Sequence, residues 1–139
     1  MREIRKAKPD RMVIQSPERN WDRLPASHPD HMAAGEAAIQ AVYPDARNLF
    51  AFEDLYKEEG LEPWKVREVW VMSHNSPNHF VDVTDAFDKK LAALHAHVSQ
   101  TAHNTEMPNM VRAWGERNAQ ANGLAEGRVA EVFRIVETA

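Results

Sequence analysis

Short apolar runs alternate with longer amphipathic segments along the first half of the chain. A run of strand length occupies residues 11–15, and a second run, rich in β-branched and aromatic residues, occupies residues 66–72. Between them, the polar and proline-containing stretch 16–27 predicts a loop. A helix is predicted from residue 28 to Val42 or Tyr43, because the following Tyr43-Pro44 pair disfavours further helix. The charged residues 2–8 indicate the last turns of another helix.

The second half continues the alternation. Residues 52–59 predict a short helix closed by Gly60, and residues 80–83 predict a short strand. A helix starting at Thr84 or Asp85 is expected to present one apolar stripe, formed by Phe87, Leu91, Leu94 and Val98.

Two further segments complete the pattern. A helix that opens at residues 105–108 and ends at Asn122-Gly123 is expected to pack through Met107, Met110, Val111 and Trp114. Residues 129–136 are apolar without a clear period, so the pattern is compatible with either a strand or a short helix. Strands that alternate with helices indicate an α/β layered fold, and no linker is long enough to separate two domains.

Composition narrows the functional classes. The chain has 139 residues, a net charge of −4 and no cysteine, so nucleic acid and acidic membranes are not expected partners. Any metal must therefore be held by nitrogen and oxygen ligands. Neither a secretory signal nor an apolar run of about 18 residues is present, which favours a cytoplasmic protein without a membrane segment.

The most informative motif is Ser-His-Pro-Asp-His at residues 27–31, which leads into an alanine-rich helix. Proline is favoured at the first helical position, so His28 is expected to cap the helix, with Asp30 and His31 in its first turn. His28 and His31 are three residues apart and can lean toward one side. The positive end of the helix dipole favours neutral imidazole, which is the form that binds metals.

Structural explanations exist for each histidine. The motif could be no more than a capped, solvated helix start. His74 and His79 flank a predicted turn and are expected to be exposed, although they could join His31 in a different metal site. His95 and His97 lie on a predicted helix, where roles in packing or on the surface are favoured. Asp82, at the end of a strand, is expected to satisfy backbone groups.

The histidine motif and five later blocks of sequence resemble one family in the same order. The motif at 27–31 and its alanine-rich helix resemble the second signature of the LmbE-like (PIG-L) zinc-dependent N-acetylglucosaminyl deacetylases. The later blocks are residues 41–47, 59–64, 66–70, 81–84 and 90–100, and residues 9–13 resemble the strand entrance that precedes the histidine motif. The resemblance covers nearly the whole chain and implies a Rossmann-like layered fold.

The family's first signature, a His-Pro-Asp-Asp-Glu-like turn, has no counterpart in the chain. In the family this turn supplies two of three zinc ligands and the general base. We therefore expect residues 1–139 to be the C-terminal portion of a single deacetylase domain, with the N-terminal strands missing and the zinc site incomplete.

The resemblance implies a role for each residue of the motif. His31 matches the third zinc ligand, His28 matches the residue beside the substrate carbonyl, and Asp30 matches the residue that orients His28. The implied reaction is removal of an acetyl group from an N-acetylglucosamine-type sugar conjugate. The alternative is a non-catalytic or inactive half-domain that associates with a complementing chain or forms a homo-oligomer.

Overall fold

The structure is a computed structural model, and it describes residues 1–138. The chain divides into two compact units. Unit 1 consists of residues 1–78 together with the described residues from Phe133 onward, and unit 2 consists of His79–Val132. Four strands are hydrogen-bonded in the order β1-β2-β4-β3. This mixed α/β architecture confirms the predicted fold class.

Unit 1 contains the helices and strands of the first half of the chain, as predicted. Its elements are α1 (Arg2–Ala7), β1 (Arg11–Gln15), the 3-10 turn η1 (Leu24–Ala26), α2 (Pro29–Val42), η2 (Asp45–Arg47), α3 (Glu53–Lys57) and β2 (Glu68–Met72). The last strand, β4 (Ala130–Glu137), begins in unit 2 and continues in unit 1. The apolar segment 129–136, whose pattern was compatible with a strand or a short helix, is therefore a strand.

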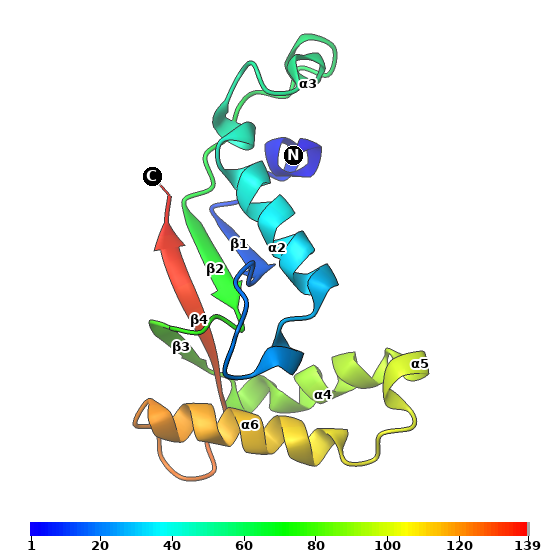
Figure 1. Ribbon diagram of the computed structural model, residues 1–139, viewed down its shortest axis with the longest axis vertical. Helices are drawn as coiled ribbons and strands as arrows, with labels where there is room; N and C mark the ends of the chain where they lie inside the picture. Colours follow the sequence, from blue (N-terminus) through cyan, green and yellow to red (C-terminus); the bar gives the residue numbers. More distant parts are fainter. Residues whose placement is uncertain (139) are drawn as a thin grey trace. The chain divides into compact units, whose positions relative to one another are not determined.

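The sheet of unit 1 has one face packed against α2. β1 and β2 are parallel, with Ile14 opposite Val71, and β4 runs antiparallel to β2, with Val136 opposite Val69. Helix α2 lies across this face (Figure 1) and contributes Val42, which is 1% exposed. The buried cluster on this face consists of Ile4, Ile14, Val42, Ala46, Val66, Val69 and Val71. Burial of these aliphatic side chains is the main favourable term for unit 1.

A buried arginine ties the N-terminal helix to the segment after α2. Arg5 is fully buried. Its guanidinium donates to the carbonyl oxygens of Asp45, Ala46, Asn48 and Ala51, at 2.8–3.3 Å. Because a buried charge is costly without partners, these four acceptors explain how Arg5 is accommodated in the core. Two tryptophans of unit 1 are also largely shielded from solvent: Trp70 is 9% exposed, and Trp64 packs against the cluster.

Unit 2 contains β3 (His79–Asp82), the 3-10 turn η3 (Thr84–Ala86), α4 (Phe87–His95), α5 (Val98–Thr101) and α6 (Met107–Ala121). Helices α4 and α6 are joined by a cation–π contact, in which the Arg112 guanidinium lies 4.2 Å from the Phe87 ring centroid. Asp82 has the predicted structural role, because it accepts hydrogen bonds from the backbone N–H and hydroxyl of Thr84 and from Arg128.

Two predictions about unit 2 are wrong in detail. The stripe that begins at Phe87 does not reach Val98, because α4 ends at His95 and Val98 starts α5 with 65% of its surface exposed. In α6, Met110 and Trp114 are 62% and 42% exposed. The buried side of α6 is instead formed by Met107, Gly115 and Ala119. Of the predicted stripe, Met107 is therefore packed, whereas Met110 and Trp114 are not.

Candidate functional site

The histidine motif has the local geometry that the sequence predicts. Pro29 is the first residue of α2, and His28 is its N-cap, with an extended backbone. The Nδ1 atom of His28 accepts a hydrogen bond from the backbone N–H of Asp30 at 3.3 Å. Because Nδ1 is the acceptor in this bond, the proton of the neutral ring is assigned to Nε2. The N–H of His28 therefore belongs to the nitrogen that faces away from the helix backbone.

His31 lies beside His28, as the spacing predicts. The two ring centroids are 5.5 Å apart and the rings are inclined by 49°. The carboxylate of Asp30 lies 3.9 Å from Nδ1 of His28, which is too far for a hydrogen bond. His28, Asp30 and His31 are all exposed. The motif thus places two imidazoles and one carboxylate at an accessible helix start.

The donors present do not complete a zinc site. A catalytic zinc takes three protein ligands and keeps one open position. Within residues 1–138, no three His, Cys, Asp or Glu side chains are arranged to hold one metal ion. His31 can supply one imidazole, with His28 beside it, and any further ligand must come from outside the described residues.

A contact that the sequence did not predict lies at the carboxyl ends of β1 and β2. Nε2 of His74, in the loop after β2, lies 3.2 Å from Oε2 of Glu18, in the loop after β1. The same loops are joined by the Asn75 side-chain amide, which donates to the carbonyl oxygen of Arg19 at 3.2 Å. Ligands of α/β sheets bind at this edge. The contact follows from the parallel pairing of β1 and β2, which brings the loops after the two strands together.

The imidazole of His74 has a neighbour on each side. Nδ1 of His74 accepts a hydrogen bond from the backbone N–H of Ser76 at 2.9 Å, and Nε2 on the other side of the ring faces the carboxylate of Glu18. The His74 side chain is only 16% exposed. The expectation that His74 is an exposed imidazole is therefore wrong, because its ring is held between the two loops.

Three other histidines belong to unit 2. His79 is on β3, and its ring stacks on Phe80 with a centroid separation of 6.5 Å. His95 is the last residue of α4, and His97 caps α5. His79, His95 and His97 are exposed.

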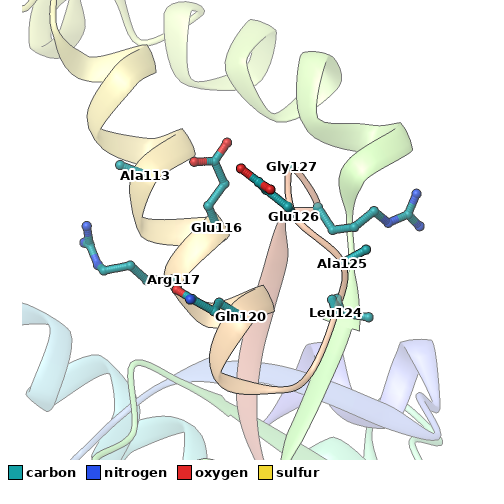
Figure 2. A pocket seen from close by; sticks show the side chains of 9 residues that line it. Ala113, Glu116, Arg117, Gln120, Leu124, Ala125, Glu126 and Gly127 are labelled. Carbon is teal, nitrogen blue, oxygen red and sulfur yellow. The ribbon is translucent and has the colours of Figure 1, made fainter.

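Unit 2 has a groove of its own. It lies between α6 and the loop that follows it, has a volume of about 590 Å³ and is lined on opposite sides by Glu116 and Glu126 (Figure 2). None of the motif residues lines this groove. Its mixed charges include Arg117 and Arg128, and the latter is already paired with Asp82. Because its glutamates and arginines belong to unit 2, they can serve as control positions for substitutions in unit 1.

A helix that crosses a bilayer must be both long and apolar. No helix within residues 1–138 has both the length and the apolar character that a membrane span needs.

Comparisons with known proteins support the resemblance. No family model matches the chain. Diacetylchitobiose deacetylase of Thermococcus kodakarensis is 37% identical over 98 residues, which cover 70% of this chain and 34% of that protein. The structure of N,N'-diacetylchitobiose deacetylase from Pyrococcus horikoshii, complexed with its inhibitor MPG, matches with a TM-score of 0.79 and 28% identity, covering 98% of this chain and 49% of that chain.

A conserved protein from Thermus thermophilus shares the fold, with a TM-score of 0.71 at 22% identity, over 99% of this chain and 57% of that chain. The chain thus spans about a third of the Thermococcus protein and about half of the Pyrococcus chain. Sequence similarity to one deacetylase and the fold shared with another confirm the resemblance found in the sequence. The proteins to which this chain is similar are diacetylchitobiose deacetylases, and it matches only part of their length.

Proposed function

We propose that this chain contributes to a zinc-dependent amidohydrolase that removes an acetyl group from an N-acetylglucosamine-type sugar conjugate. The observation that carries the proposal is the pair of imidazoles, His28 and His31, side by side at the start of α2. The proteins to which this chain is similar include two diacetylchitobiose deacetylases. A cytoplasmic location is part of the proposal.

In this proposal His31 is a metal ligand. It lies in the first turn of α2, and an imidazole is a common metal ligand. The remaining ligands come from outside the described residues. When bound, zinc supplies a nucleophilic water and an electrophile for the acetamide oxygen.

His28 acts on the substrate itself. Since Nδ1 accepts from the helix backbone, the Nε2–H group is free to donate to the developing negative charge on the acetamide oxygen. Asp30 acts through its charge on the same imidazole, at 3.9 Å from Nδ1. In this proposal His28 also acts as the general acid that protonates the leaving amine.

The experiment is a chimera in which this chain replaces the matching segment of the Thermococcus kodakarensis deacetylase. We expect the chimera to bind about one zinc per chain and to release acetate from N,N'-diacetylchitobiose. His31→Ala should remove the tight zinc, while His28→Ala should keep zinc and lower kcat by roughly 10²-fold or more, the usual contribution of a general acid or an oxyanion donor.

His95→Ala, a substitution of an exposed histidine on α4, is the matched control and should leave both zinc content and kcat unchanged. A folded, zinc-loaded chimera whose activity survives His31→Ala would contradict the assigned ligand. A folded chimera without deacetylase activity would contradict the proposed function of the chain.

A second candidate function is association without catalysis. β1 is at one end of the strand order, and Val13 on it is 53% exposed. Edge strands present unpaired backbone groups that can pair with another chain. If β1 is an interface with a complementing chain or a second copy, the isolated protein should self-associate, and Val13→Lys should shift it toward the monomer in sedimentation analysis. A wild-type chain that stays monomeric at high concentration and binds no complementing segment would exclude this function.

A further inference from the structure

A groove on the α2 side of the unit 1 sheet has no assigned role. It lies near the carboxyl end of β2, between α2 and β4, and has a volume of about 570 Å³. This size is within the range of small-molecule sites. Its lining residues are Pro17, Glu18, Ile39, Val71, His74, Ser76, Arg134 and Val136. The motif residues are not among them, so the groove is distinct from the histidine motif.

The polar groups of the groove carry both signs of charge. Glu18 is held by the imidazole of His74 on one side, and its side chain remains 57% exposed. Arg134 projects from β4, where it pairs with Val71 of β2. No hydrogen bond or ion pair of the Arg134 guanidinium occurs within residues 1–138. A ligand in the groove can therefore donate to a carboxylate and accept from an unpaired guanidinium.

The remaining lining is aliphatic. Ile39 of α2, Val71 of β2 and Val136 of β4 belong to the same side of the sheet, and Val136 is 43% exposed. An apolar surface next to a few convergent polar groups is the usual composition of a small-molecule site. Exposure of Val136 leaves apolar area that a ligand can cover.

We propose that this groove binds one ring of a neutral saccharide. A pyranose has C–H faces that can cover the aliphatic side chains, and hydroxyls that can both donate to Glu18 and accept from Arg134. An anionic ligand would be opposed by Glu18, and a cationic ligand would be opposed by Arg134. A neutral, hydroxyl-rich ring satisfies both groups.

The groove is connected to the histidine motif through the loop after β1. Glu18 is two residues from Asn20, hence within about 7 Å of it along the chain. The backbone N–H of Asn20 donates to the hydroxyl of Ser27 at 2.7 Å, next to His28. The assignment of the bound ring to a non-reacting part of the deacetylase substrate rests on the proposed function, whereas saccharide binding to the groove does not. Contacts with such remote parts can position the reacting acetamide.

The test uses the chain itself, with EDTA present so that no metal contributes. We titrate the ¹⁵N-labelled protein with N,N'-diacetylchitobiose and, separately, with inorganic phosphate. The sugar is expected to shift the backbone amides of Glu18, His74 and Arg134 in a saturable manner. Phosphate is expected to leave them unchanged.

Glu18→Gln and Arg134→Gln should each raise the Kd for the sugar by roughly tenfold, the effect of removing a hydrogen bond to a charged group. The matched controls carry the same changes in the groove of unit 2 (Figure 2), as Glu126→Gln and Arg117→Gln, and should leave the Kd unchanged. The amide spectrum of each variant reports whether it is folded, so either groove variant suffices if the other fails to fold.

The proposal is overturned if the sugar does not bind, if its shifts map to other residues, if both folded groove variants bind like the wild type, or if phosphate saturates the same amides. These outcomes are independent of zinc binding and acetate release in the chimera. A chimera without activity, combined with metal-free sugar binding at Glu18 and Arg134, would reject the proposed function and retain the saccharide site.

Discussion

Gly35 of α2 lies directly against the carbonyl oxygen of Gln15 at the end of β1. A β-carbon built on Gly35 would come within 2.5 Å of that oxygen and within 2.9 Å of the nitrogen of Pro17. The helix therefore rests on the backbone of the strand end without an intervening side chain. Because Pro29 precedes Gly35 by six residues, α2 begins about 9 Å before this contact. The close approach thus positions the histidine motif relative to the carboxyl edge of the sheet.

Gly35→Ala is expected to destabilise the protein. On an exposed helical surface, alanine in place of glycine adds about 0.5–1 kcal/mol of stability. At Gly35 the new methyl group meets backbone atoms that cannot move independently of β1, so we expect a loss of about 1–3 kcal/mol. Urea denaturation shows whether the free energy of unfolding falls or rises in the variant. The control Ala34→Gly, at an exposed position of the same helix, should lose only about 1 kcal/mol. Stabilisation by Gly35→Ala would contradict the close approach.

The carboxylate of Asp82 should make the stability of unit 2 depend on acidic pH. The hydroxyl and backbone N–H of Thr84, followed by Arg128, lower the pKa of Asp82 below its ordinary value of 3.8. A group whose pKa is lower in the folded state stabilises the protein above its unfolded-state pKa. This contribution is lost as the pH falls from about 4 through the lower folded-state value.

Asp82→Asn is therefore expected to be less stable than the wild type at pH 6, and the difference should shrink below pH 4. Urea denaturation followed through the Val129 amide, which donates to the Thr84 hydroxyl, reports on this cluster. Glu68→Gln is the comparison in unit 1, where the Trp70 indole N–H and then Arg11 lower the pKa of Glu68. An Asp82→Asn penalty that is constant from pH 6 to pH 2 would contradict the charged interaction.

The helix that carries the motif could be predicted because its signals are local. A capping residue, a proline at the first helical position and Tyr43-Pro44 at the end all act within a few residues, and α2 has the bounds that they indicate. The proximity of His28 and His31 follows from helical spacing alone. Three of the four strands were also predicted, because their apolar runs end at polar or proline-containing loops, whereas residues 129–136 were left open between a strand and a short helix.

Interactions between distant segments could not be predicted in the same way. The Glu18–His74 contact joins residues 56 positions apart, and it depends on β1 and β2 being neighbours in the sheet. In α6, apolar residues occur on more than one side, so spacing alone did not identify the packed face. The structure shows that Gly115 sets this face, because a β-carbon there would lie 2.3 Å from Cγ1 of Val129.

The packed face of α6 can be tested with two methionines of the same helix. Met107 is 9% exposed and Met110 is 62% exposed. Met107→Ala should therefore lower the free energy of unfolding by about 2–5 kcal/mol, as expected for a buried methionine. Met110→Ala should change it by less than about 0.5 kcal/mol. Equal losses for the two variants in urea denaturation would show that both side chains are packed.

His28 has a structural and a proposed chemical role, and two substitutions separate them. His28→Ala removes the acceptor for the Asp30 N–H and should destabilise α2 by about 0.5–2 kcal/mol. His28→Asn supplies a side-chain oxygen that caps helices well, so it should recover most of this stability. An amide has no titratable proton near neutral pH, so His28→Asn should still lack the acid that the proposed deacetylase reaction needs. In the chimera we therefore expect wild-type stability together with kcat lowered as in His28→Ala. Restoration of kcat by His28→Asn would mean that His28 matters only as the cap of α2.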